Sequence, residues 1–138
     1  MAVQAAHEFQ AYMESKDMHV RIPEDDENVA LMQFNLDGTN IRLFISFSED
    51  SRVVNIEGRN FVSIPADKHD LVYKLCNECN YNYRWIKFIW DEKHEEVSSL
   101  VDAIIDADTG AEECYELVMR TCSIVQSCYP LFMKAIWA

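Results

Sequence analysis

The last 28 residues, Ala111 to Ala138, constrain the fold of this chain more than any other segment. Their apolar side chains recur at alternating steps of three and four, which is the spacing of one face of an α-helix. At about 1.5 Å per residue such a helix spans roughly 40 Å, long enough to cross a whole sheet. We interpret the apolar face chiefly as core, the alternative being that part of it contacts another chain or a client peptide. The members of the stripe are Tyr115, Val118, Cys122, Val125, Tyr129, Phe132 and Ile136.

Two local signals refine this predicted helix. Pro130 falls on the polar side of the stripe, where it removes one backbone hydrogen bond and bends the helix while the carbonyl of Gln126 can turn to water. Thr109 and Glu112 have the spacing of a capping box, in which each side chain bonds a backbone N–H at the helix start. We therefore expect the helix to begin just after Thr109.

The segments before it alternate between helical and strand-like patterns. Asp37-Gly38 separates two runs of alternating apolar residues and is a strong signal for a hairpin, because both residues tolerate a positive φ. The resulting order is α-β-β-β-α-β-β-α in a single domain of residues 1–138, which predicts an α+β fold with a mainly antiparallel sheet and helices on one face. The expected elements are helices over 2–17 and from Pro65 to about 80–82, and strands over 30–36, 41–47, 52–57, 85–91 and 97–107.

Charge and composition exclude several classes of function. The formal net charge is −12, from 24 acidic and 12 basic residues. Nonspecific binding to nucleic acid or to anionic membranes needs clustered Lys and Arg, so we expect neither partner. No window approaches the roughly 20 apolar residues that span a bilayer, and the first residues lack the basic start and apolar stretch of a signal peptide. These features predict a cytoplasmic protein.

The chain resembles the YbjN family of bacterial proteins, which are described as sensory-transduction regulators. The residues that carry the resemblance are the Asp37-Gly38 hairpin, the helix running into Asn80, the aromatic strand that ends in Trp90-Asp91, and the closing segment 128–137, Cys-Tyr-Pro-Leu-Phe-Met-Lys-Ala-Ile-Trp. The resemblance covers roughly residues 30–137, with Cys128 standing where the family often has a second aromatic residue. It implies the fold of type III secretion chaperones, which are small, acidic and commonly dimeric. It supplies no catalytic residues, and fold alone does not establish a secretion role.

The five cysteines offer one alternative reading. Cys76 and Cys79 form a Cys-x-x-Cys pair, which suits a redox centre or half of a zinc site. The pair falls in the last turns of its predicted helix, where the helix dipole disfavours a thiolate. A zinc site would need two further ligands, and the sequence has no second pair with suitable spacing. We therefore interpret the thiols as structural and keep a metal- or thiol-dependent protein as the alternative.

The strand predicted at 85–91 is apolar on both sides. Trp85 and Ile89 alternate with Ile86, Phe88 and Trp90, so either both faces of the sheet are covered or one face carries an exposed patch. No nucleophile, acid–base or metal pattern appears elsewhere, and we predict no catalytic residue, no metal and no cofactor. The function predicted from the sequence is a non-enzymatic, chaperone-like or regulatory protein-binding module that forms a homodimer. The residues predicted to contact the partner are Trp90, Tyr129, Phe132 and Trp137.

Overall fold

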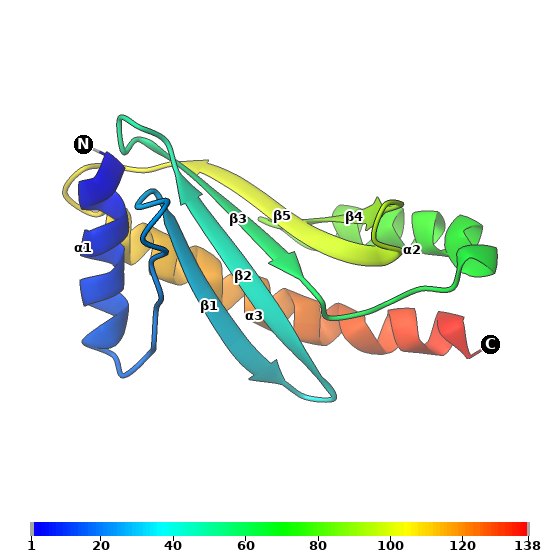
Figure 1. Cartoon of the computed structure of the whole chain (residues 1–138). Coiled ribbons are helices and arrows are strands. Elements are labelled where there is room, and N and C mark those ends of the chain that lie inside the picture. The colour runs from blue at the N-terminus through cyan, green and yellow to red at the C-terminus, as the bar shows by residue number, and fades with distance from the viewer. Residues whose placement is uncertain (1, 138) are drawn as a thin grey trace.

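The computed structural model describes residues 2–137, with side chains from residue 5 onward. Its element order confirms the predicted α+β arrangement (Figure 1). The elements are α1 (Ala2–Glu14), β1 (Val29–Leu36), β2 (Thr39–Phe47), β3 (Val53–Arg59), a 3-10 turn (Ala66–Lys68), α2 (His69–Asn82), β4 (Lys87–Asp91), β5 (Glu96–Ile104) and α3 (Gly110–Ile136).

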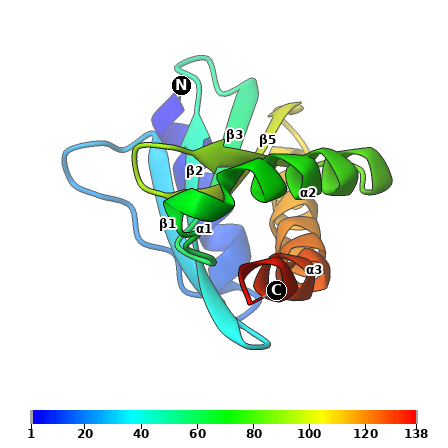
Figure 2. The same ribbon diagram turned by 90° about the vertical axis from the view of Figure 1, so that its right-hand side faces the viewer.

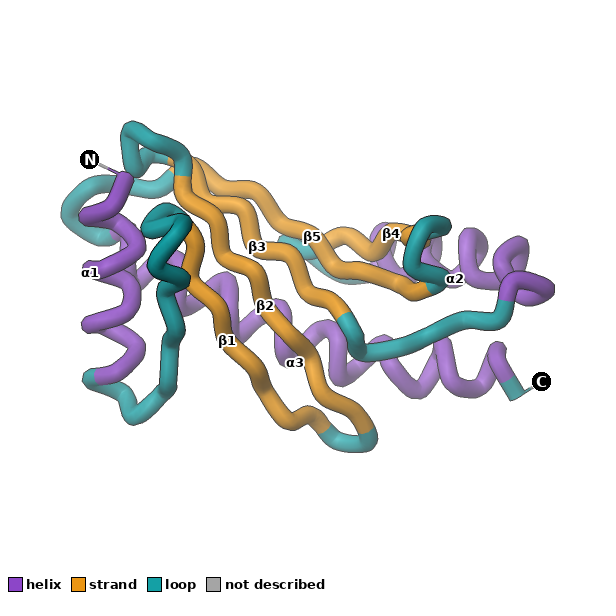
Figure 3. Tube along the Cα trace, viewed as in Figure 1, coloured by secondary structure: helices purple, strands orange, loops and turns teal. Residues whose placement is uncertain are grey.

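The strands form one sheet in the order β1-β2-β3-β5-β4, in which every neighbouring pair is antiparallel (Figure 3). β1–β2 and β4–β5 are hairpins. β3 joins them by pairing with both β2 and β5, with Ile56 opposite Ile45 on one side and opposite Val101 on the other. The sheet therefore places β1 and β4 at its two edges.

Helix α3 passes behind β1, β2 and β3 in the view of Figure 1 and closes the core of the sheet. Its buried residues follow the helical repeat, and Val118, Val125 and Phe132 have no exposed surface. Phe132 meets Phe88 of β4 with ring centroids 5.6 Å apart, while Phe9 of α1 meets Phe47 of β2 at 6.0 Å. The strands turn their alternate residues towards this helix layer. Among the described residues, no helix covers the opposite face of the sheet.

Several boundaries differ from the sequence-based expectation for identifiable reasons. The first helix ends at Glu14 rather than at residue 17, and Asp17 has a φ of 61° that no helix can continue. The strand expected from Trp85 begins at Lys87, because Trp85 itself has a φ of 80°. The capping box does not form: the side chain of Thr109 makes no cap hydrogen bond, and its carbonyl accepts from the N–H of Glu113 at 3.0 Å.

The two edges of the sheet are treated differently. On β4, the side chain of Asn80 accepts a hydrogen bond from the N–H of Phe88 (2.6 Å) and donates one to its carbonyl (3.1 Å), so α2 supplies what a further strand would supply. On β1, the backbone of Arg21 pairs with that of Leu31 through bonds of 3.0 and 2.8 Å. That bridge is isolated, and the described chain adds no further pairing along this edge beyond Leu31.

Candidate functional site

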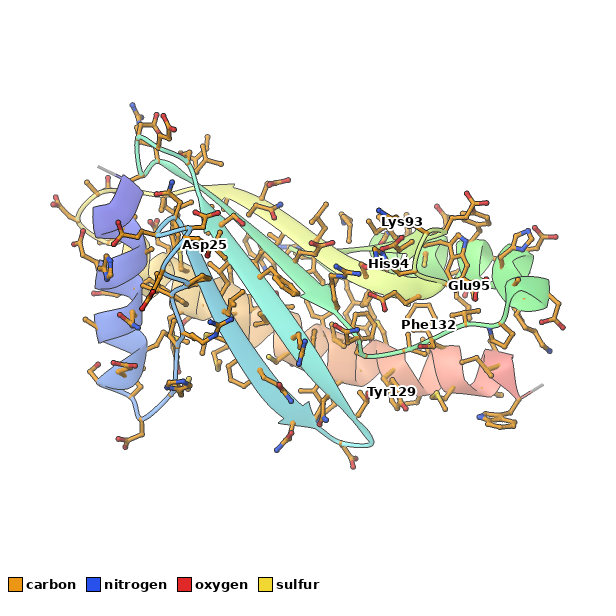
Figure 4. All side chains as sticks on the ribbon, viewed as in Figure 1. Asp25, Lys93, His94, Glu95, Tyr129 and Phe132 are labelled. Atoms are coloured by element: carbon orange, nitrogen blue, oxygen red, sulfur yellow. The ribbon has the colours of Figure 1, made fainter. Side chains whose placement is uncertain are left out.

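The four residues that sequence reasoning proposed as partner contacts lie in different environments. Phe132 is fully buried and serves the core, so it has no surface with which to touch a partner. Trp90 is partly buried against the core. Tyr129 lies on a separate flank of α3, where its hydroxyl donates to the carbonyl of Gly38 in the β1–β2 turn at 3.3 Å (Figure 4). Trp137, at the end of α3, is 80% exposed and is the one member of the set that stands clearly in solvent.

Further exposed side chains, most of them apolar, lie on α2, on the loop after it and on one flank of α3. Helix α2 lies above the C-terminal half of α3 in both Figure 1 and Figure 2. We call this region the α2–α3 surface. Its exposed side chains are Leu71, Tyr73, Tyr81, Trp85, Arg120 and Leu131.

The two helices turn these side chains outward because of their spacing. The buried side chains of α2 are Val72, Cys76 and Cys79. Tyr73 and Tyr81 therefore lie on the side of the helix that faces solvent. On α3, Arg120 and Leu131 are eleven residues apart and therefore share a flank. The guanidinium of Arg120 lies 5.8 Å from the ring centroid of Trp85, which fixes that flank of α3 beside the loop after α2.

Trp85 is the least ordinary residue of this surface. Its φ of 80° is left-handed, a conformation that costs a residue with a bulky side chain on the order of 1–2 kcal/mol. The strain does not serve the core, since 53% of the side chain remains exposed. Arg120 holds the indole by a cation–π contact instead. A strained backbone that presents a half-exposed tryptophan is typical of a binding site.

A polar cluster lies at one end of the open face of the sheet. Glu96 is buried, and its carboxylate accepts from Nε of Arg59 at 3.2 Å. Arg59 also lies 4.0 Å from Asp91, whose carboxylate contacts Nδ1 of His94 at 2.7 Å in the β4–β5 turn. The hydrogen bond from His94 holds the pKa of Asp91 below its usual value. Figure 4 shows His94 on this turn, and the cluster has the form of an ion network that pins β3, β4 and the turn together.

The cysteine pair has the chemistry of packed side chains. Cys76 and Cys79 are both buried in α2, and burial raises the pKa of Cys76 to about 12 and that of Cys79 above its usual value. The thiol of Cys79 is hydrogen-bonded to that of Cys128, so Cys79 has a thiol partner on α3. All five cysteines are free thiols. Across the described residues, no group of three or more His, Cys, Asp or Glu side chains is placed to hold a metal ion.

Sequence reasoning missed most of the α2–α3 surface. The alternation in the segment 85–91 correctly separates Trp85 and Ile89 from the buried side, since Ile86 and Phe88 are buried while Trp85 and Ile89 are exposed. No pattern in the sequence marks Arg120 as the partner of Trp85, because the two residues are 35 positions apart and meet only through the packing of α2 on α3.

Comparison with known proteins resolves the family. The sequence profile of the YbjN family, described as "Putative bacterial sensory transduction regulator", matches residues 6–133 of the 138. The chain belongs to the YbjN family.

The YbjN assignment agrees with the fold. The crystal structure of YbjN from E. coli, described there as "a putative transcription regulator", superposes with a TM-score of 0.65. The alignment covers 90% of each chain at 7% sequence identity, so it shows a shared fold and says nothing about shared residues. None of the curated proteins compared with the chain matches it by sequence. Within residues 2–137, no helix is both long and apolar enough to cross a membrane.

Proposed function

We propose that this YbjN-family chain is a non-enzymatic, cytoplasmic regulator, chaperone-like in its mode of action, that binds a protein partner through the α2–α3 surface. The observation that carries the proposal is Trp85, whose strained backbone presents a half-exposed indole against Arg120. Tryptophan and arginine are among the residues most enriched where interfaces concentrate their binding energy.

The surroundings of Trp85 support this proposal. Tyr81 is 89% exposed, and Leu71 and Leu131 are each exposed by more than a third. Such a surface costs solubility unless charge offsets it, and the net charge of −12 does so. The description of the family as a regulator supports a regulatory role, and the absence of a catalytic pattern among the described residues is consistent with binding as the activity.

A second copy of the chain is the first partner to test. Light scattering coupled to size-exclusion chromatography, over a dilution series of the reduced protein, measures whether a dimer forms. We expect the native chain to dimerise and the variant Trp85→Gly to lose dimerisation. Trp137→Ser provides a control, since Trp137 is also a tryptophan and is even more exposed than Trp85, but lies at the end of α3.

A strictly monomeric native chain would exclude the second copy and leave another protein as the partner. Site-specific photo-crosslinking then tests the surface itself. A crosslinker that replaces Tyr81 should capture one defined protein from the source cell, the same crosslinker at the exposed position Glu49 should not, and Trp85→Gly should abolish the capture. Equal capture from both positions would refute the proposed site.

The alternative function, a metal- or thiol-dependent protein using Cys76 and Cys79, is disfavoured by their burial and raised pKa values. Elemental analysis and alkylation of the native protein test it directly. We expect no stoichiometric metal, and alkylation that becomes fast only after denaturation. Stoichiometric zinc, or a thiol that reacts rapidly in the native state, would restore this alternative.

A further inference from the structure

The free edge of the sheet lies beside a cleft of about 540 Å³, well away in sequence from α2 and from the second half of α3. One wall of the cleft is the segment 17–19 and the other is β1, with β2 behind it. A volume of this size is within the range of about 300–1,000 Å³ that is usual for ligand-binding clefts.

The cleft exists because the chain leaves the sheet after one pair of hydrogen bonds. Arg21 and Leu31 exchange both backbone bonds, so their N–H and C=O groups face each other across the edge. Residues two and four positions further along β1, Gln33 and Asn35, must point the same backbone groups outward, because strand residues alternate. Going backwards from Arg21, the chain turns away near Asp17, where φ is 61°. The outward N–H and C=O of Gln33 therefore face the cleft, and those of Asn35 lie further along the same edge; the described chain places no strand opposite either residue.

At the other edge of the sheet, α2 packs beside β4, and the side chain of Asn80 bonds both outward backbone groups of Phe88. Sheet edges that are left open invite the addition of a strand from another chain.

Charge and register define what such a strand would carry. Arg21 and Leu31 are directly opposite each other, as are Gln33 and Arg42, and all four side chains lie on the open face of the sheet. An added strand would continue along β1 from the position that Arg21 occupies opposite Leu31. Its residue opposite Gln33 would therefore have Arg21 as its neighbour along the edge, and Arg42 of β2 on the far side of Gln33. Neither arginine forms an ion pair with any side chain among residues 5–137. An acidic side chain at that position would meet two unpaired guanidinium groups.

The neighbours of that acidic residue would point the opposite way. They would point to the core side of the sheet, where Met18 and the partly buried Phe34 line the cleft near the buried Val20. The complementary pattern is therefore acidic on one side and apolar on the other. Among the described side chains that line the cleft, Asp17 is the one acidic residue.

We propose that the β1 edge binds an extended peptide segment of another protein, in which acidic and apolar residues alternate, by adding it antiparallel to the sheet as a sixth strand. A second copy of this chain fits less well. The side chains of β1 on the open face of the sheet are Leu31, Gln33 and Asn35, and none of them is acidic. Pairing two β1 edges would therefore bring Arg21 and Arg42 of both copies together without a carboxylate between them.

Fluorescence anisotropy with a labelled seven-residue peptide of alternating valine and glutamate, blocked at both ends, tests this inference. We expect it to bind about tenfold or more tightly than the same peptide with lysine in place of glutamate. Since a residue opposite Gln33 points its own N–H at β1, methylating the glutamate nitrogens should abolish binding. Methylating the valine nitrogens, which point to solvent, should change the affinity by less than about threefold.

Variants of the protein separate this inference from the proposed function. Arg42→Gln should weaken peptide binding about five- to tenfold. Gln33→Pro should abolish it, because proline removes the outward N–H and is tolerated on an edge strand, and a thermal melt checks that this variant folds. Arg120→Gln, on the α2–α3 surface, should leave peptide binding unchanged.

Four results would overturn the inference. The first is equal binding of the glutamate and lysine peptides, and the second is equal inhibition by the two methylation patterns. The third is a dimer of the native chain that Gln33→Pro dissociates, since a second copy would then occupy the edge. Absence of any anisotropy change up to the solubility limit of the protein would also refute it.

Discussion

Trp85 allows a direct test of the strain on which the proposed site depends. A tryptophan presents on the order of 250 Å² of surface, and 53% of Trp85 is exposed, so rather less than half is buried. At ~25 cal/mol per Å² that burial contributes up to about 3 kcal/mol. Trp85→Ala loses most of this and keeps the strained φ, so we expect a destabilisation of about 2 kcal/mol.

Trp85→Gly loses the same contacts but relieves the strain, because glycine adopts a positive φ without cost. The relief of about 1–2 kcal/mol exceeds the ~0.4–1 kcal/mol by which glycine favours the unfolded chain. The glycine variant should therefore be more stable than the alanine variant by about 1 kcal/mol. Urea unfolding followed by circular dichroism measures both free energies.

The same pair of substitutions at Asn77 provides the control. Asn77 is exposed in the interior of α2, where alanine should be more stable than glycine by about 1 kcal/mol. The order of the two variants should thus reverse between the two positions. If alanine were as stable as glycine at position 85, the left-handed backbone would carry no strain, and the main argument for the α2–α3 surface would fail.

Three further predictions concern the sheet. Gly58→Ala would drive its Cβ into Oγ of Ser99, so calorimetry should show a destabilisation of about 1–3 kcal/mol that Ser99→Gly partly restores. Full stability of the single variant would contradict this packing. Asn80→Ala should cost about 1–3 kcal/mol in urea unfolding, because it strips both hydrogen bonds from the β4 edge; a cost no greater than that of Asn77→Ala would show that water replaces them. The lowered pKa of Asp91 means that its bond to His94 contributes stability above the unfolded pKa of about 3.9 and loses it as the pH falls. The difference in Tm between the native chain and Asp91→Asn should therefore shrink from pH 7 to about pH 3, and a constant difference would refute the bond.

Much of the fold is predictable because it depends on local patterns. The stripe of α3 and the hairpin at Asp37-Gly38 predict helix and turn directly, and both are present at nearly the expected positions. Phe132 shows the limit of this reasoning. Its place in the stripe is compatible with a core or with a partner, and only the contact with Phe88 assigns it to the core.

The candidate sites are harder to predict, because they depend on pairs of distant residues. Trp85 meets Arg120 only after α2 packs on α3, and its positive φ overrides a strongly β-prone sequence. The capping box at Thr109 failed for a similar reason. The carboxylate of Glu113 accepts the N–H of Asp106 at 2.9 Å, so the connection from β5 replaces the local cap.

The sequence by itself determines which segments are helices and strands, the order in which they follow one another, and which side of each is apolar, since periodicity and turn chemistry act over a few residues. The tertiary structure alone decides which edge of the sheet is closed and which is open. That choice depends on Asn80 reaching the backbone of β4 and on residues 17–19 turning away from β1 after a single bridge. Neither arrangement can be recognised from a local sequence pattern. Each depends on the free energy of packing a helix or a loop against a strand that it reaches only in the folded chain.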